Sequence, residues 1–196
     1  MTEDYRVLST EEIKQLISQG CSCDDWANVM VSQNFQVKQV RGCTFSGKVL
    51  LGSFDKQIKF VGGVLRPSGI TNATIHNCII GDNVYINNIR NYIANYKIED
   101  DVVVEDTDLL AVDGLSSFGN GVNVAVLNES GGREVPIYDK LSAQVAYIIA
   151  FYRHRNKVID KLSRMIRNYT DSVTRSMGVI GRGCRIVNCK VVKDIK

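Results

Sequence analysis

Apolar residues recur at every sixth position over residues 80–110, namely Ile80, Ile86, Tyr92, Ile98, Val104 and Leu110. A spacing of six fits neither the 3.6-residue period of a helix nor the two-residue alternation of an isolated strand. A unit made of one short strand and one corner does fit, because the strand supplies inward apolar positions and polar residues supply the turn. The pattern therefore predicts a coiled chain of short strands.

Three such units close one triangular coil, and stacked coils pair their strands in parallel around a continuous apolar interior. The hexads IGDNVY (80–85) and IEDDVV (98–103) begin eighteen residues apart, so we expect one to lie above the other. The spacing is fainter from residue 37, and GGVLRPSG (62–69) predicts a loop pushed out of the wall. We predict coils over residues 37–137.

The flanking segments have other patterns. Residues 1–36 are predicted as a capping helix and a lead-in, with Ser9 as N-cap, Glu12 completing a capping box and Gly20 ending the helix. Over 138–177 the apolar period becomes helical and predicts an inserted helical hairpin. Hexads restart over 178–196 without a capping element, so we expect the N-terminal part of a longer protein or a chain that relies on a partner.

The hexads IGDNVYI and IEDDVVV resemble the repeats of the transferase hexapeptide superfamily. The resemblance implies a mainly β fold, a left-handed parallel β-helix of hexapeptide coils with an N-terminal helix and an inserted helical hairpin. It also implies a homo-oligomer, usually a trimer. From DYRVL through HNCIIGDNV and LNESGGREV to YRHR, the chain further resembles an uncharacterised family of long hexapeptide-repeat proteins from bacteria related to Bacteroides.

Charge is unevenly distributed along the chain, although a net charge of +3 is too small to predict nucleic-acid binding. Residues 98–113 carry seven carboxylates and no Lys or Arg, whereas 138–177 carry eight Lys or Arg and three Asp. The two segments form either two solvated faces or a contact through opposite charge.

The composition predicts a cytoplasmic protein that does not enter a membrane. The acidic, polar start MTEDYRVLST is not a secretory signal, and the longest apolar run, VAYIIAFY, is too short to span a bilayer. The six cysteines are therefore expected to be thiols, and their spacing predicts no metal site.

His76, in ATIHNCIIGDN, is the strongest candidate for a catalytic side chain. Imidazole suits general-base catalysis because its ordinary pKa lies near neutrality and a partner on the second nitrogen can fix its tautomer. The resemblance implies a histidine that takes a proton from an acceptor hydroxyl or amine as it attacks an acyl-CoA thioester. Asn77, Asn95 or Asp82 could supply that partner of His76 or orient a substrate. The alternative is a structural histidine, hydrogen-bonded within its own wall.

Two further motifs are candidates for binding. In NESGGREVP, Glu129 and Arg133 flank a glycine pair that weakly resembles the phosphate-holding turn of sugar-nucleotide pyrophosphorylases. In FYRHRNK, the basic residues Arg153, His154 and Arg155 could bind a phosphate of CoA or of a nucleotide. A plain turn and an exposed corner between helices, respectively, would give the same residues.

We therefore expect a transferase-like protein that, if it is an enzyme, is an acyl-CoA-dependent acyltransferase acting on a sugar or nucleotide-sugar. Acyl-CoA would be a co-substrate, and no covalently bound cofactor is predicted. The alternative is a non-catalytic β-helix scaffold or an oligomerisation domain of a larger protein. The chain contains no serine nucleophile elbow, Walker loop or dinucleotide fingerprint. Their absence argues against a serine hydrolase, a P-loop nucleotide hydrolase and a dinucleotide-binding enzyme.

Overall fold

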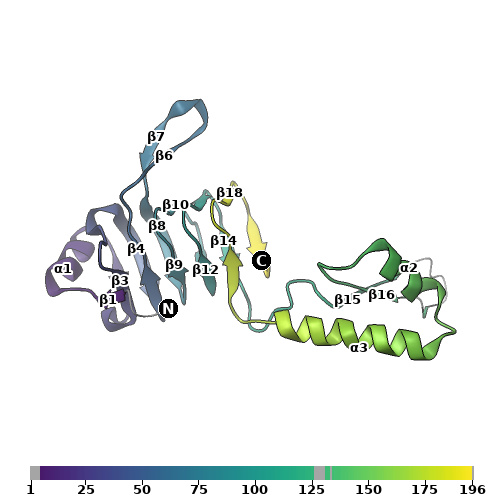
Figure 1. The fold of residues 1–196 in the computed structure, drawn as a ribbon. Helices are drawn as coiled ribbons and strands as arrows, with labels where there is room; N and C mark the ends of the chain where they lie inside the picture. Colours follow the sequence, from purple (N-terminus) through teal and green to yellow (C-terminus); the bar gives the residue numbers. More distant parts are fainter. Residues whose placement is uncertain (1–4, 126–130, 133, 196) are drawn as a thin grey trace. The chain divides into compact units, whose positions relative to one another are not determined.

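The computed structural model describes residues 5–125, 131–132 and 134–195, and the fold is mainly β (Figure 1). The chain forms two compact units. Unit 1 contains the chain up to Asp113 together with Met177–Asp194, and unit 2 contains Gly114–Ser176. Unit 2 is thus inserted in the sequence of unit 1.

Unit 1 contains one α-helix, α1 (Thr10–Ser18), three short 3-10 helices and most of the strands. The 3-10 helices are η1 (Trp26–Asn28), η2 (Val37–Gln39) and η3 (Val61–Gly63). The strands are β1 (Tyr5–Val7), β2 (Ser22–Cys23), β3 (Val29–Ser32), β4 (Val40–Ser46), β5 (Val49–Leu51), β6 (Gln57–Lys59), β7 (Leu65–Pro67), β8 (Gly69–His76), β9 (Ile79–Ile80), β10 (Tyr85–Asn87), β11 (Tyr92–Ala94), β12 (Tyr96–Ile98), β13 (Val103–Glu105), β14 (Leu109–Ala111), β17 (Gly178–Ile180), β18 (Arg185–Val187) and β19 (Val191–Lys193).

Two sheets of stacked, mainly parallel strands form unit 1. One runs β1-β3-β5-β9-β12-β17, with only the β1–β3 pair antiparallel. The other curls at β8, whose start pairs with β10 and whose end pairs with β11. Ile80 lies opposite Ile98, and Tyr85 lies opposite Val103. The prediction that the hexads at 80 and 98 lie one above the other is confirmed.

The interior is lined by one aliphatic side chain from each short strand. Ile80, Ile86, Ile98, Val104 and Leu110 are fully buried, as the six-residue spacing predicts. The prediction that Tyr92 also faces the interior is wrong, because its side chain is 39% exposed and Ile93 takes the inward position. The corner after β10 is one residue longer than the hexad allows, so the alternation of the next strand shifts by one position.

The corners of unit 1 are built from residues with left-handed backbone. Asn88, Asp106 and Asn188 have φ of 58°, 49° and 56° and come directly after β10, β13 and β18, which pair with one another. Asn72, with φ of 53°, lies within β8 between the part that pairs with β10 and the part that pairs with β11. Asn, Asp and Gly tolerate this conformation best, because other side chains clash with the backbone. Asn83 and Asn95 share it at other corners. The asparagine-rich sequence is therefore explained largely by corner geometry.

The loop predicted from GGVLRPSG is a hairpin of β6 and β7 that extends away from the parallel strands (Figure 1). Gly62 and Gly63 at its tip have φ of 76° and 81°. At its base, Arg66 pairs with Glu105 at 2.5 Å and donates to the Tyr85 hydroxyl at 2.8 Å. The base of the hairpin is therefore tied to strands β10 and β13.

Helix α1 begins with the predicted capping box. Glu12 N–H donates to Ser9 Oγ at 3.2 Å, and Ser9 N–H donates to the Glu12 carboxylate at 2.8 Å. The N–H groups of both terminal nitrogens of Arg6 donate hydrogen bonds to the same carboxylate, each at 2.7 Å. These hydrogen bonds, of which that from Arg6 has the largest effect, lower the pKa of Glu12 to about 2. The Glu12 carboxylate is therefore charged at neutral pH and stabilises the helix there.

Unit 2 contains helices α2 (Ala143–Phe151) and α3 (Asn156–Val173) and the antiparallel strands β15 (Val122–Ala125) and β16 (Glu134–Ile137). Val135, Ile149, Ala150 and Ile166 form its buried core. The segment 114–137, assigned to the coils by the sequence pattern, lies in this unit instead. Val122 and Val124 of β15 pair with Ile137 and Val135 of β16, and Val135 belongs to the core that includes residues of both helices, which hexad counting does not anticipate.

Both ends of the insertion meet the same residue of unit 1. Asn95 Nδ2 donates to the Val112 carbonyl at 2.9 Å, where the chain leaves the coils. The Asn95 carbonyl accepts from Gly178 N–H at 3.0 Å, where the chain returns. β17 then pairs with β12 in the register that an uninterrupted coil would have. Unit 2 therefore replaces one corner and leaves the stacking of unit 1 unbroken.

Candidate functional site

His76 is the last residue of β8 and lies in an outward-facing column of aligned residues. Its register partners on either side are Ser46 and Ala94, and the column continues through Ala111 to Lys193. The neighbouring residues Phe45, Ile75, Ile93 and Leu110 face the interior and are fully buried. Alternation along the strand therefore directs His76 to the outer surface of the wall.

Both ring nitrogens of His76 are hydrogen-bonded. Nδ1 lies 2.8 Å from Ser46 Oγ, and Nε2 lies 2.8 Å from Asn77 Nδ2. Asn77 Oδ1 accepts from Lys48 N–H at 3.0 Å, which turns the Asn77 amide nitrogen toward the imidazole. Because an amide nitrogen can only donate, Nε2 accepts and the neutral ring carries its proton on Nδ1. Ser46 and Asn77 thus select the tautomer whose basic nitrogen is Nε2.

A groove of about 460 Å³ lies beside His76, and we call it the His76 groove. The residues that line it come from five strands (β4, β8, β11, β14 and β19) and from the corners after β11 and β14: Ser46, Thr74, His76, Tyr92, Ala94, Asn95, Leu109, Ala111, Val112, Asp113 and Lys193. Lys193 Nζ lies 2.8 Å from Asp113 and closes one end. The groove combines a mostly small and apolar floor with a histidine, an amide and an ion pair, which suits a small polar ligand.

Asn77 and Asn95, both predicted to bind substrate, have structural roles as well. Each lies at a corner with left-handed backbone, at φ of 49° and 60°. Asn77 orients His76, and Asn95 joins the two ends of the insertion. Asn95 lines the His76 groove together with His76, so the structure does bring these two candidates together.

A second groove, of about 290 Å³, was not anticipated from the sequence, and we call it the basic groove. Lys38, Arg41 and Arg66 line it with polar side chains of β8 and β10. Arg66 is paired with Glu105, whereas Lys38 and Arg41 form no ion pair with any residue that the structure describes. Lys38 and Arg41 are three residues apart, but Arg66 is distant from both in sequence, so no local motif could have indicated that the three converge.

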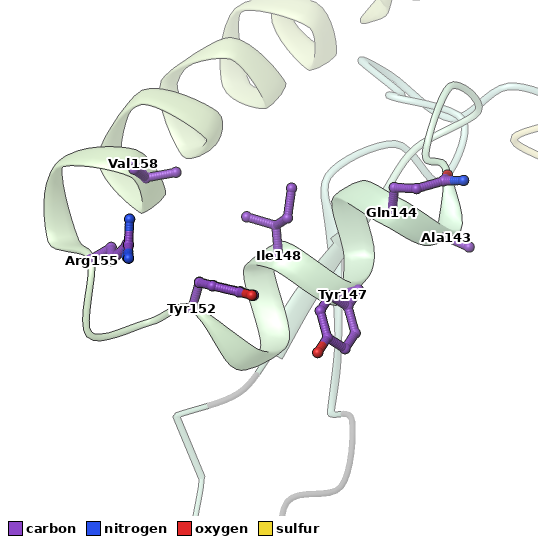
Figure 2. Close-up of a pocket in the computed structure, with 7 residues that line it drawn as sticks. All are labelled: Ala143, Gln144, Tyr147, Ile148, Tyr152, Arg155 and Val158. Carbon is purple, nitrogen blue, oxygen red and sulfur yellow. The ribbon is translucent and has the colours of Figure 1, made fainter.

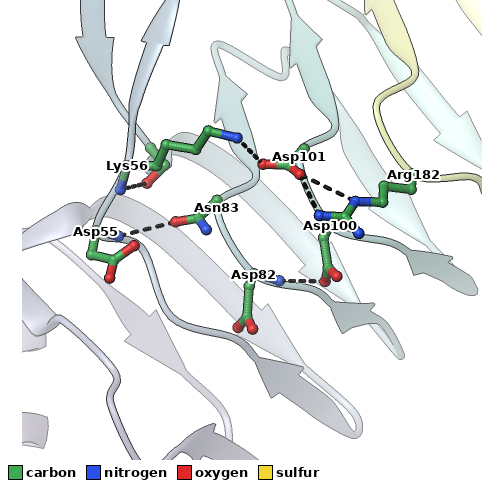
Figure 3. Close-up of polar contacts among 8 residues, drawn as sticks. Asp55, Lys56, Asp82, Asn83, Asp100, Asp101 and Arg182 are labelled. Atoms are coloured by element: carbon green, nitrogen blue, oxygen red, sulfur yellow. Dashed lines mark hydrogen bonds and ion pairs between the residues drawn. The ribbon is translucent and has the colours of Figure 1, made fainter.

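The acidic segment 98–113 is compensated inside unit 1. Asp101 pairs with Lys56 at 2.5 Å and with Arg182 at 3.0 Å, and Asp100 accepts from Asp82 N–H at 2.9 Å (Figure 3). Hydrogen bonds from Lys56 and Arg182 lower the pKa of Asp101, and the one from Lys56 has the larger effect. The other carboxylates bond to neighbouring side chains: Glu99 to Lys97, Glu105 to Arg66, Asp106 to Asn88, Asp108 to Arg90 and Asp113 to Lys193. The negative charge of this segment is therefore largely balanced within unit 1.

The basic candidates Arg153, His154 and Arg155 do not converge. Arg153 donates to the Glu134 carbonyl of β16. Arg155 instead lies with Tyr152 and Val158 around a hollow of about 640 Å³ between α2 and the start of α3 (Figure 2). Its guanidinium lies 5.9 Å from the centroid of the Tyr152 ring, and the His154 ring lies 5.9 Å from the same ring. Arg153 and Arg155 therefore line different grooves, and anion binding by the three residues stays a prediction.

The candidates Glu129 and Arg133 lie outside the described residues. Within the described residues, no group of three or more His, Cys, Asp or Glu side chains could hold a metal ion. Over the same part of the chain, no helix has the length and apolar character needed to cross a membrane. All six cysteines are free thiols.

Comparison with known proteins gives a family but no activity. An uncharacterized protein of Treponema pallidum (strain Nichols) is 29% identical over 202 residues, which cover 97% of this chain and 28% of that protein. The chain thus spans about a quarter of the length of this relative. No solved structure matches the chain. Residues 5–196 match the family described as "Domain of unknown function (DUF4954)", so the chain belongs to that family.

Proposed function

We propose that unit 1 is a left-handed parallel β-helix of the transferase hexapeptide type, and that its His76 groove is a site of acyl transfer. Two observations support this fold. Paired residues of β10 and β13 are eighteen positions apart in the sequence, and the corners contain residues with positive φ. The observation that carries the function is the tautomer of His76, which presents the basic Nε2 beside a groove. A substrate hydroxyl would replace the Asn77 amide as the partner of Nε2.

The reaction follows from that arrangement. An acceptor hydroxyl of a sugar or nucleotide-sugar transfers its proton to His76 Nε2 while its oxygen attacks the carbonyl carbon of an acyl-CoA thioester. The carbon–sulfur bond breaks, the CoA thiolate leaves and accepts the proton from the imidazolium, and an ester is formed. Ser46 accepts from Nδ1–H and holds the ring in place throughout. His76 is thus the general base and Ser46 a positioning residue.

The basic groove offers contacts for the phosphates of acyl-CoA. Strand β8 lines both grooves, with Thr71 in the basic groove and Thr74 in the His76 groove. Thr71 and Thr74 lie on either side of the corner at Asn72, and three residues span at most about 11 Å, which the pantetheine arm of CoA can bridge. Lys38 and Arg41 supply the uncompensated positive charge that phosphates require. A reaction of acyl-CoA implies a cytoplasmic protein, in keeping with six free thiols.

Acetyl-CoA should change the ring resonances of His76 and leave those of His154 unchanged. The chain contains only these two histidines, so a protein labelled with ¹⁵N-histidine reports on both in one titration, and His154 of unit 2 is an internal control. Replacing Lys38 and Arg41 together with alanine should weaken binding about tenfold, as expected for a lost charged contact. Acetyl-pantetheine, which lacks the nucleotide phosphates, should bind the variant and the natural chain equally.

A titration in which neither histidine responds would contradict acyl-CoA binding at this site. Equal changes at His76 and His154 would indicate non-specific association and count against the proposal in the same way. If acetyl-CoA binds but the double alanine variant keeps the natural affinity, the assignment of the phosphates to the basic groove is wrong.

A second candidate function, a non-catalytic scaffold, is favoured by the exposed aromatic surface of unit 2. Tyr147 is 54% exposed and Phe151 is 51% exposed, and their rings lie 4.8 Å apart. Exposed aromatic side chains of this size commonly mark contacts between proteins. Under this proposal the surface joins copies of the chain into a homo-oligomer, with the trimer as the expected state from the hexapeptide resemblance.

Replacing Tyr147 and Phe151 together with serine should then lower the oligomeric mass to that of the monomer. The physical reason is the loss of the apolar area that association would bury. Sedimentation equilibrium measures the mass, and Val122→Ser, at another exposed apolar position of unit 2, is the matched control. An unchanged mass in the double variant would contradict assembly through this surface.

A further inference from the structure

A third groove, of about 430 Å³, lies within unit 2, and we call it the inserted groove. Its lining comes from both strands of the hairpin, from α2 and from α3. The polar members that matter are Arg153, Ser163, Arg167 and Thr170, and the apolar ones are Ile149, Ile159 and Ile166. The groove shares no residue with the His76 groove or the basic groove.

Two buried donors in this groove have no hydrogen-bond partner among the described residues. They are the Nε–H of Arg153 and the hydroxyl of Thr170. Over the described part of the chain three buried side-chain polar atoms are in this condition, and two of the three belong to residues that line the inserted groove. An unsatisfied buried donor costs about 1–3 kcal/mol. A ligand with hydrogen-bond acceptors that binds in this groove would remove that cost for both donors.

The surroundings fix Arg153 and Thr170 in place. Arg153 Nη2 donates to the Glu134 carbonyl, which anchors the guanidinium against β16 while leaving Nε–H unused. A Cβ at Gly121, whose φ is 85°, would approach the Thr170 side chain to 3.1 Å. Glycine at this position therefore allows the hairpin backbone to lie close to Thr170.

The charges and the apolar side chains restrict the chemistry of that acceptor. Arg153 favours an oxyanion, because a guanidinium binds a carboxylate through strong hydrogen bonds. Glu134 and Asp171 balance the charges of Arg153 and Arg167 in the lining, so the groove has no net positive charge to hold a doubly charged phosphate. Three isoleucines favour a ligand with an apolar body. We propose that the inserted groove binds a small branched monocarboxylate, whose oxygens accept from Arg153 Nε–H and the Thr170 hydroxyl.

This proposal is independent of acyl transfer at His76 and is tested on the full chain. The probe is 4-methylpentanoate, titrated by isothermal calorimetry, with inorganic phosphate as the comparison anion. We expect saturable binding of the carboxylate and none of phosphate at the same concentration. Thr170→Val, which keeps the shape of the side chain but removes the hydroxyl, should weaken carboxylate binding about tenfold. Thr170→Ser, which keeps the hydroxyl, should bind like the natural chain.

The stability of Thr170→Val separates a binding role from a merely structural one. Because the hydroxyl has no partner in the described structure, its removal should leave the melting temperature unchanged or raise it. A lowered melting temperature would show that the hydroxyl is satisfied in solution and would overturn the argument. Equal binding of phosphate and 4-methylpentanoate, unchanged affinity in Thr170→Val, or no saturable binding of the carboxylate would each overturn the proposal as well.

Discussion

Replacing Gly178 with alanine is expected to lower the free energy of unfolding of unit 1 by about 1–3 kcal/mol. Gly178 is the first residue of β17, where the chain re-enters the coils, and it pairs with Tyr96. An added Cβ would lie 2.3 Å from Cε1 of the Tyr96 ring, which is fully buried. Because protein interiors are closely packed, the extra methyl group overpacks the interior around this ring.

Urea unfolding followed by tryptophan fluorescence measures this effect in unit 1 alone, because the single tryptophan, Trp26, belongs to that unit. Gly181→Ala is the matched control three residues later. Its added Cβ would meet only Cys184 Sγ, at 4.0 Å, so we expect stability within about 0.5 kcal/mol of the natural chain. Equal stability of the Gly178 and Gly181 variants would contradict the packing described here.

The stacking of unit 1 could be predicted from the sequence because the repeat is a packing requirement. Ile80, Ile98 and Val104 recur at the hexad spacing because each must face the interior once per strand. The capping box of Ser9 and Glu12 is local in sequence and was predicted for the same kind of reason. The hexad repeat and the capping box each depend on the conformation of one strand, corner or helix turn, which a short stretch of sequence specifies.

The candidate site could be predicted only in part, because its members meet through register. His76 was identified, but Ser46 and Lys193 were not, since their distance from His76 in space depends on how many residues each coil and the insertion contain. Tyr92 was assigned to the interior because the longer corner before it is invisible to a fixed period. Arg153 and Arg155 were grouped because they are near in sequence, yet they line different grooves.

His76→Ala should lower kcat/KM for acyl transfer by about 10²- to 10⁴-fold, the usual contribution of a general base. Among the described residues that line the His76 groove, the imidazole is the only group with an unprotonated nitrogen, Nε2, for which a substrate hydroxyl would replace the Asn77 amide. Ser46→Ala removes the partner of Nδ1 but not the base, so a smaller loss, about tenfold, is expected. His154→Ala, in unit 2, should retain the natural rate.

The most direct measurement of the proposed activity is the release of CoA thiol from acetyl-CoA in the presence of a panel of sugars and nucleotide-sugars. The natural chain should release CoA in proportion to the concentration of at least one acceptor. His76→Ala should abolish that acceptor-dependent release, and His154→Ala should not change it. No acceptor-dependent release by the natural chain, or an undiminished rate in His76→Ala, would contradict acyl transfer at the His76 groove.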